Sequence, residues 1–385
     1  MGARSSLPGR FWLLIAATFL GFLGFGTVLP GLAPHIHNDL GGSDRTVGFV
    51  IGTFSVVALC SRVFAGRIAD RKGRKLAFLT GLTSCTLAGC AYLLPIGVAA
   101  MYLGRTLQGI GEACLYTGAA AWCVEVAGVQ RSARALGYLS SGIWGGVAAG
   151  PLIGQLVGSF RHAAEFQVIL ALSALALLSQ VPEDYRPSAH HAPKKWIKRS
   201  LIPAGLSVGF VNVHYPVVTG FLILHLARHG NAGPDAFSTY AGMVLLSRFF
   251  LGGLPDRIHP RITFYSGICG MAAGLILLAT GPGFPGAIAG AALLGFGFSF
   301  PWASIVSTVL RKTPDGERGS TVSLLSAFYD LFVGVSSFTA GIVANSFGYA
   351  AAFLMAAAAL GAAAAAGRYV FTQRAPALAE SEAAA

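Results

Sequence analysis

The chain is poor in charged residues. Only 11% of its 385 residues are Asp, Glu, Lys or Arg, whereas soluble globular chains carry about 25%. Together with 54% hydrophobic residues and a mean hydropathy of +0.66, this deficit excludes a water-soluble enzyme of ordinary kind. It equally excludes intrinsic disorder, which needs low hydrophobicity and high net charge.

The motifs of several chemistries are also missing. The six cysteines form no Cys-x-x-Cys pair, so neither a disulfide framework nor a zinc site is indicated. Neither a Walker A lysine loop nor a nucleophile elbow occurs. We therefore expect no enzyme activity, no bound metal and no cofactor. The net charge of +12 comes from basic residues in short segments between apolar spans, which favours a membrane-topology signal over nucleic-acid binding.

Apolar segments long enough to cross a bilayer, which takes about 20 residues, recur along the whole chain. This pattern predicts an all-α integral membrane protein with twelve transmembrane helices in two pseudo-symmetric six-helix bundles. One long polar stretch divides it into an N-terminal bundle at 1–181, a cytoplasmic linker at 182–200 and a C-terminal bundle at 201–385. The predicted helices are 11–33, 46–69, 74–96, 98–124, 133–159, 163–181, 201–226, 236–255, 263–281, 285–310, 318–345 and 347–371.

The basic residues are distributed asymmetrically between the two sides of this arrangement. If both termini are cytoplasmic, twenty-one of the 27 Lys and Arg residues fall on the cytoplasmic side and three in outer loops. The other three, Arg62, Arg105 and Arg248, fall within helices. The positive-inside rule then predicts a multi-pass protein of the cytoplasmic (inner) membrane with both termini in the cytoplasm.

The two halves repeat. Residues 61–75 read SRVFAGRIADRKGRK and residues 247–261 read SRFFLGGLPDRIHPR, with six of fifteen positions identical at an offset of 186 residues. Parallel repeats of this kind are typical of one large class of secondary transporters.

Residues 66–75 carry the first motif, G-x-x-x-D-R-x-G-R-[RK], between the second and third predicted helices. On this motif the chain resembles the major facilitator superfamily, and within it the drug/proton antiporter branch of twelve-helix proteins. The resemblance implies a gating loop in which Asp70 docks onto the eleventh helix and Arg74 pairs with Glu125. The alternative is a positive-inside cluster without a gating role. The loop residues are Gly66, Asp70, Arg71, Gly73, Arg74 and Glu125.

Two further motifs carry the same resemblance. The stretch from Arg105 to Gly111, with Gln108, matches R-x-x-Q-G-x-G on the fourth helix, where the family's arginine is linked to proton coupling. The alternative is a structural arginine bonded to nearby carbonyl groups. The fifth helix matches the antiporter motif except at Gln155, which implies export and a close helix contact. Its residues are Gly137, Gly146, Gly150, Pro151 and Gly154.

Four polar residues are predicted to lie near the membrane midplane. Glu112 is about 20 Å and Asp330 about 18 Å from the inner surface at 1.5 Å per residue, and Asn212 and His214 lie similarly deep. A buried carboxylate is costly unless protonated, paired or hydrated, so the two acids are candidates for proton coupling. Asp330 is the expected proton carrier and Glu112 the expected substrate or gating contact, because Arg105 on its own helix offers Glu112 a counter-charge. That order fails if Arg62, Arg248 or His214 reaches Asp330. His214 either shares the proton or is a satisfied core residue.

Aromatic residues lie near the same depth, including Phe25, Tyr116, Trp144, Tyr215, Trp302 and Tyr329. An aromatic-lined cavity suits amphiphilic or cationic ligands, although any single one of these rings is more often an ordinary packing or lipid-facing residue. Arg62 and Arg248 occupy matched positions in the two halves. They either line the cavity and receive an anionic group or extend to the inner headgroups.

Together these features predict a secondary active transporter that exports a small organic molecule by proton antiport with alternating access. The alternatives are a dedicated exporter of a metabolite (a sugar, nucleoside, amino-acid derivative or metallophore), proton-coupled uptake, and a non-transporting membrane scaffold or receptor on the same fold. The expected partners are a small-molecule substrate, protons and the lipid bilayer, with no nucleic acid, and the protein is expected to be a monomer.

Overall fold

The computed structural model describes residues 8–128, 131–183, 199–229, 232–251, 258–313 and 318–372, in which every regular element is a helix. The N-terminal half contains α1 (Gly9–Thr27), α2 (Leu29–Pro34), the π-helical turn η1 (His35–Asp39), α3 (Asp44–Lys72), α4 (Arg74–Tyr92), α5 (Val98–Ala127), α6 (Ser132–Leu156) and α7 (Phe160–Ser179). The C-terminal half contains the 3₁₀ turn η3 (Arg199–Leu201), α8 (Ile202–Asn212), α9 (His214–Ala227), α10 (Gly233–Leu251), α12 (Pro260–Ala279), α13 (Phe284–Arg311), α14 (Arg318–Phe347) and α15 (Tyr349–Thr372).

These helices confirm the predicted fold class. Counting α1 with α2 and α8 with α9, the described residues contain twelve crossings. Eight of the described helical stretches are long and apolar enough to cross a membrane by length and composition. A chain that crosses a bilayer must satisfy its backbone hydrogen bonds internally, which a helix does. Most of the expected linker lies outside the described residues, so the domain boundaries stay a prediction.

The first and seventh crossings differ from their predictions, because neither is one continuous helix. The break falls at Val28 between α1 and α2, and at Val213 between α8 and α9. A proline follows each break within three residues, Pro30 and Pro216. Proline lacks the N–H that would continue the helical hydrogen-bond ladder, so each crossing contains a local bend at nearly matching positions of the two halves.

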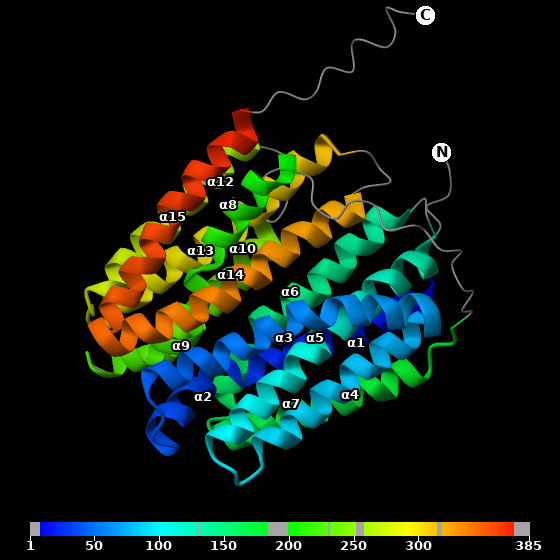
Figure 1. Ribbon diagram of the computed structural model, residues 1–385, viewed down its shortest axis with the longest axis horizontal. Helices are drawn as coiled ribbons and strands as arrows, with labels where there is room; N and C mark the ends of the chain where they lie inside the picture. Colours follow the sequence, from blue (N-terminus) through cyan, green and yellow to red (C-terminus); the bar gives the residue numbers. More distant parts are fainter. Residues whose placement is uncertain are drawn as a thin grey trace, which may run out of the picture.

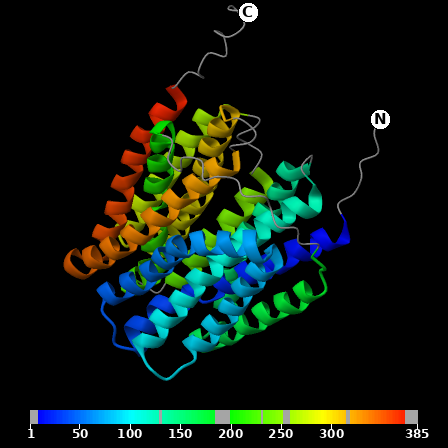
Figure 2. The ribbon, with the colours of Figure 1, turned by 45° about the vertical axis from the view of Figure 1, so that its right-hand side comes forward.

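The two bundles converge at one end of the molecule and diverge toward the other (Figures 1 and 2). They converge where α2 and α9 lie, and diverge toward the end where α1 begins and α15 ends. At the converging end α3 and α14 are in backbone contact: a Cβ added to Gly48 would lie 2.5 Å from the carbonyl oxygen of Ser337 and 2.6 Å from the Cα of Gly341. Tyr349 also donates a hydrogen bond to Asp44 across the bundles, 2.8 Å long.

At the diverging end, two glycines of the described helices have open surroundings. A Cβ added to Gly66 on α3 or to Gly137 on α6 would meet no described atom within 4 Å. Phe64 on α3 and Phe249 on α10 are 61% and 81% exposed. The molecule is therefore in a state in which the two bundles are closed against each other at one end. The closed end is the one at α2 and α9, opposite the start of α1 and the end of α15.

Candidate functional site

A three-residue ionic cluster joins the two bundles midway along their length. Arg62 on α3 donates from Nε and Nη2 to Oδ2 of Asp330 on α14, at 2.7 and 2.6 Å. Its Nη2 also lies 3.3 and 3.4 Å from the carboxylate oxygens of Glu112 on α5. All three side chains are largely buried, at 20% exposed for Arg62, 12% for Glu112 and 7% for Asp330. We call these three residues the ionic cluster.

The charges of the ionic cluster do not balance when both acids are ionised. One guanidinium faces two carboxylates, which leaves a formal charge of −1 in a largely buried place. Buried charge is costly unless it is compensated. A proton or a cation held there removes the excess, so the cluster has the chemistry to bind either. Tyr116, one turn after Glu112, packs against the cluster with its ring centroid 5.2 Å from the Arg62 guanidinium carbon.

The structure changes the roles that the sequence suggested for the two acids. Arg62 reaches Asp330, so the argument that made Asp330 a better proton carrier than Glu112 no longer holds. Arg105 reaches neither acid in the structure, so the expected counter-charge for Glu112 comes from Arg62 instead. The two carboxylates therefore share one counter-charge, the guanidinium of Arg62.

Arg105 belongs to a separate buried network inside the N-terminal bundle. Its Nη1 donates to Oε1 of Gln108 at 2.8 Å, and its guanidinium carbon lies 4.4 Å from the ring centroid of Phe54. Gln108 in turn accepts from the Tyr92 hydroxyl at 2.8 Å and donates to Gln167 at 2.9 Å. The network ties α4, α5 and α7 together. This geometry favours the structural alternative for Arg105, and Gln108 is its central residue.

His214 and Asn212 flank the bend between α8 and α9, and their hydrogen bonds are made to groups other than the two acids. Nδ1 of His214 lies 2.7 Å from the carbonyl oxygen of Val211, and Nε2 lies 3.1 Å from the Tyr240 hydroxyl. Both ring nitrogens are therefore engaged, as in a satisfied core histidine. Asn212 donates to the carbonyl oxygen of Val208 at 2.7 Å, while its own Oδ1 is buried without a partner among the described residues.

Several of the predicted aromatic residues lie beside the ionic cluster, whereas Phe25 packs against Phe22 and Phe54. Tyr329, next to Asp330 on α14, packs edge-on against Trp302 of α13 and Trp144 of α6, with ring centroids 6.4 and 6.3 Å apart. Trp144 is also stacked under Arg248 of α10. The rings thus connect both bundles around the acids.

The gating-loop residues lie at the diverging end of the molecule. Arg74 and Glu125 face each other with Nη1 and Oε2 2.8 Å apart, both partly exposed. Gly73 has φ of 114°, a region that suits glycine, and its turn lets α4 start directly after α3. Asp70 and Arg71 are exposed in the last turn of α3, and Gly66 precedes them by one turn.

One acid of this region was missed as a functional candidate. The Glu183 carboxylate accepts hydrogen bonds from the backbone N–H groups of Arg74 and Lys75, at 2.6 and 3.0 Å. It therefore caps the N-terminus of α4, where a negative charge is stabilised by the helix dipole. The sequence placed it in the linker, and no local pattern connects it with a turn 109 residues away.

The glycine motif of α6 packs against α1 within the N-terminal bundle. A Cβ added to Gly150 would lie 2.5 Å from the Cα of Gly26, and one added to Gly146 would lie 2.6 Å from the carbonyl oxygen of Phe19. Pro151 lies at the same contact with Gly26, and Gly154 meets the backbone of Thr27. Gly137 departs from the pattern, since no described atom lies near its Cβ position.

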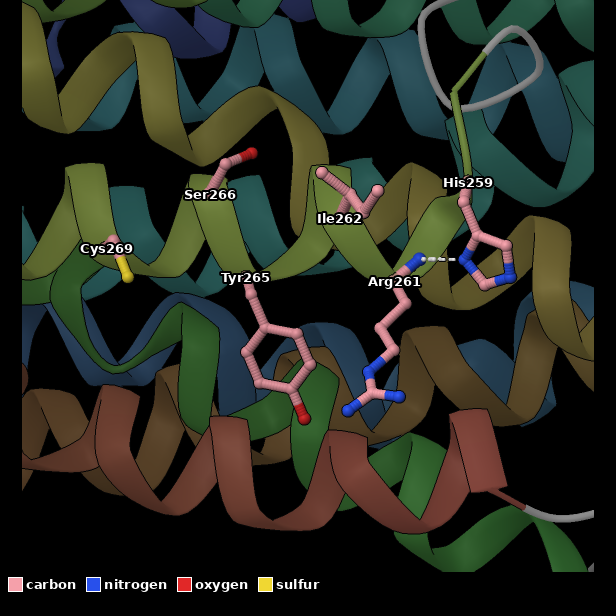
Figure 3. Close-up of a pocket in the computed structure, with 6 residues that line it drawn as sticks. All are labelled: His259, Arg261, Ile262, Tyr265, Ser266 and Cys269. Atoms are coloured by element: carbon pink, nitrogen blue, oxygen red, sulfur yellow. Dashed lines mark hydrogen bonds between the residues drawn. The ribbon is translucent and has the colours of Figure 1, made fainter.

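A separate hollow lies on the side of the C-terminal bundle. Figure 3 shows it along α12, where Arg261 and Tyr265 point toward α15 while Cys269 and His259 lie at its two ends. Tyr265 donates to the carbonyl oxygen of Ala364 on α15 at 3.3 Å. No acid or aromatic residue of the ionic cluster lines this hollow. The interface between the bundles, where the charged and aromatic side chains lie together, is therefore the candidate site in preference to this hollow.

Comparisons with known proteins agree with this fold. The chain matches the family model of the Major Facilitator Superfamily over residues 14–232 and again over residues 217–385. An uncharacterised MFS-type transporter of Burkholderia mallei (strain SAVP1) is 28% identical over 361 residues, covering 89% of this chain and 87% of the relative. One of Pseudomonas aeruginosa (strain LESB58) is 27% identical over 366 residues, covering 92% and 91%.

Two solved structures share the architecture. The nucleoside transporter NupG superposes with a TM-score of 0.74 at 13% identity, covering 95% of this chain and 100% of that one. A D-xylose-proton symporter gives 0.74 at 17% identity, covering 91% and 96%. At these identities the likeness concerns the fold. With the family match spanning nearly the whole chain, the protein belongs to the Major Facilitator Superfamily of multi-pass membrane transporters.

Proposed function

We propose that the protein exports a small organic molecule across the cytoplasmic membrane in exchange for protons. The ionic cluster carries this proposal. Its excess carboxylate binds either a proton or a cationic group of the substrate, and the two exclude each other because one occupant already neutralises the charge. Mutually exclusive binding at one site is the basis of antiport.

The cluster also links occupancy to the position of the bundles. Arg62 and Glu112 belong to the N-terminal bundle, whereas Asp330 belongs to the C-terminal one. Arg62 therefore makes a charged contact between the bundles while Asp330 is ionised. Protonation of Asp330 removes the charge from two hydrogen bonds that each contribute about 1.5 to 3 kcal/mol when charged. Changes of this size are sufficient to shift the equilibrium between two bundle arrangements.

The orientation of the closed end fits export. With both termini cytoplasmic, as the distribution of basic residues predicts, the sealed end faces outward and the diverging end faces the cytoplasm. This state receives substrate from inside the cell. Rocking of the bundles about the cluster then opens the other end.

The test is transport by the purified protein in liposomes, with and without an imposed pH gradient. The transported compound is a ligand first identified by thermal stabilisation of the protein. Asp330→Asn and Glu112→Gln each leave one acid on Arg62 and a neutral cluster. We expect both variants to lose pH-gradient-driven transport while they retain downhill exchange.

Glu165→Gln is the matched control, because Glu165 lies on α7 outside the cluster, where it pairs with Arg161. It should transport as the wild type does. If gradient-driven transport survives in both cluster variants and in their double variant, the two carboxylates do not couple transport to protons. If transport is accelerated instead when protons and substrate move in the same direction, the protein is a proton-coupled uptake carrier and not an exporter.

A further inference from the structure

Arg248 occupies the position in the C-terminal half that Arg62 occupies in the N-terminal half, at the 186-residue offset between the repeats. The same offset relates the partners of the two arginines. Glu112 corresponds to Phe298, and Asp330 corresponds to Trp144. The repeat thus places one arginine against two carboxylates and the other against two aromatic rings.

The structure bears out this correspondence in space. The guanidinium carbon of Arg248 lies 4.1 Å from the ring centroid of Trp144 and 5.3 Å from that of Phe298. Trp144 comes from the opposite bundle, as Asp330 does for Arg62. The aromatic rings hold the Arg248 side chain in place by cation–π contacts, but they contribute no counter-charge.

Arg248 lacks polar partners among the described residues. No hydrogen bond or ion pair joins it to any of them, and its Nε is buried without a partner. A guanidinium has five N–H donors in a planar fork that matches a carboxylate or phosphate. Within a membrane protein an uncompensated charge of this kind is costly and typically serves a function. The group that complements this side chain is therefore an anionic one.

A small cavity lies next to the two rings that hold Arg248, although Arg248 is not among the residues that line it. This cavity of about 30 Å³, enough for a water molecule or two, lies between the bundles and is lined by Trp144, Phe298, Tyr215 and Tyr240. The ionic cluster is close by, because Trp144 contacts Tyr329, the neighbour of Asp330. One small molecule entering from the diverging end therefore encounters an excess negative charge and an excess positive charge together.

We propose that Arg248, held against Trp144 and Phe298, binds an anionic group of the substrate, which makes the transported molecule a zwitterion with an apolar or aromatic body. The cationic group occupies the ionic cluster in competition with the proton. The anionic group stays on Arg248 and takes no part in that competition. Only the binding of the cationic group at the ionic cluster rests on the proposed function, and the binding of the anionic group at Arg248 does not.

The test compares ligands that differ in one charge. Phenylalanine carries both charges, phenylalaninamide only the positive one and N-acetylphenylalanine only the negative one. Larger aromatic amino acids and aliphatic ones supply further sets of three such compounds, here called triplets. Binding is measured by ligand-induced thermal stabilisation of the purified protein and by titration. In the wild type we expect the zwitterion of the preferred body to bind about tenfold or more tightly than its amide, from the charge-assisted hydrogen bonds of Arg248.

Variants assign the preference to a residue. Arg248→Gln should reduce zwitterion binding to the level of the amide and leave amide binding unchanged, which also shows that the variant is folded. Arg248→Lys should restore part of the preference, because it keeps the charge. Asp330→Asn should weaken the amide and the zwitterion but leave the N-acetyl compound unaffected.

The anion site and the cationic role of the cluster are tested by different outcomes. Equal binding of zwitterion and amide by the wild type, or an equal loss of both in Arg248→Gln, would overturn the anion site and leave proton antiport untouched. If no triplet member stabilises the protein, the assignment of a zwitterion is refuted. Loss of N-acetyl binding with amide binding unchanged in Asp330→Asn would instead refute the cationic role of the cluster.

Discussion

The backbone contact between α3 and α14 predicts that a single methyl group opens the sealed end. In Gly48→Ala the new Cβ would lie 2.5 Å from the carbonyl oxygen of Ser337 and 2.6 Å from the Cα of Gly341. Both are backbone atoms, so no side-chain rotation relieves the overlap and the helices must separate. Overpacking of this kind costs about 1 to 3 kcal/mol. Only the sealed state bears that cost, so the equilibrium shifts about 5- to 150-fold toward the state open at this end.

The shift is measurable as a distance between the bundles. Spin labels on Asp39→Cys of η1 and Asp235→Cys of α10 report the converging end by pulsed electron resonance, after the exposed cysteines have been replaced by serine. Those cysteines are Cys60, Cys90 and Cys269. Gly48→Ala should increase the population at longer distance. Gly361→Ala on α15, where the added Cβ meets no described atom within 4 Å, should match the wild type. Identical distance distributions in Gly48→Ala and Gly361→Ala would refute the sealed-end interpretation.

Three further predictions concern the N-terminal bundle. Gly150→Ala should lower the melting temperature clearly more than Gly137→Ala, since only the former meets backbone at 2.5 Å; equal melting temperatures would contradict the α1–α6 contact. Arg74→Glu and Glu125→Arg should each slow liposome transport, and the double variant should recover part of the rate. The pair is partly exposed, so its effect on stability should stay below about 1 kcal/mol, and a double variant slower than both single ones would argue against pairing. Glu183→Ala should destabilise the protein by about 0.5 to 2 kcal/mol through loss of the α4 cap, and unchanged thermal unfolding would contradict that role.

The sequence predicted the crossings, the two halves and the loop motif, because these depend on local hydrophobicity and on short patterns. It predicted the meeting of Arg74 and Glu125 only through the family resemblance. The bends at Val28 and Val213 were missed, since apolar residues continue through both and only the nearby prolines mark them.

Long-range contacts could not be read from the chain. Arg62 and Asp330 are separated by 268 residues and lie in different bundles, so nothing local connects them. Arg105 was expected to compensate Glu112 two turns away on the same helix. Gln108, only one turn away, takes its Nη1 hydrogen bond instead. The 186-residue repeat did contain the correspondence of Arg248 with Arg62. Once the structure shows the partners of Arg62, the same offset gives the partners of Arg248.

The pH dependence of ligand affinity, measured without any gradient, tests the central claim most directly. The ligand should carry fixed charges, such as the trimethylammonium form of the zwitterion chosen by the binding screen, so that only the protein titrates. If a proton and the cationic group compete for the ionic cluster, affinity falls as pH falls, by up to about tenfold per pH unit for one proton. In Asp330→Asn the dependence should be lost. Affinity that rises on acidification, or that stays constant in the wild type, would contradict proton antiport through this cluster.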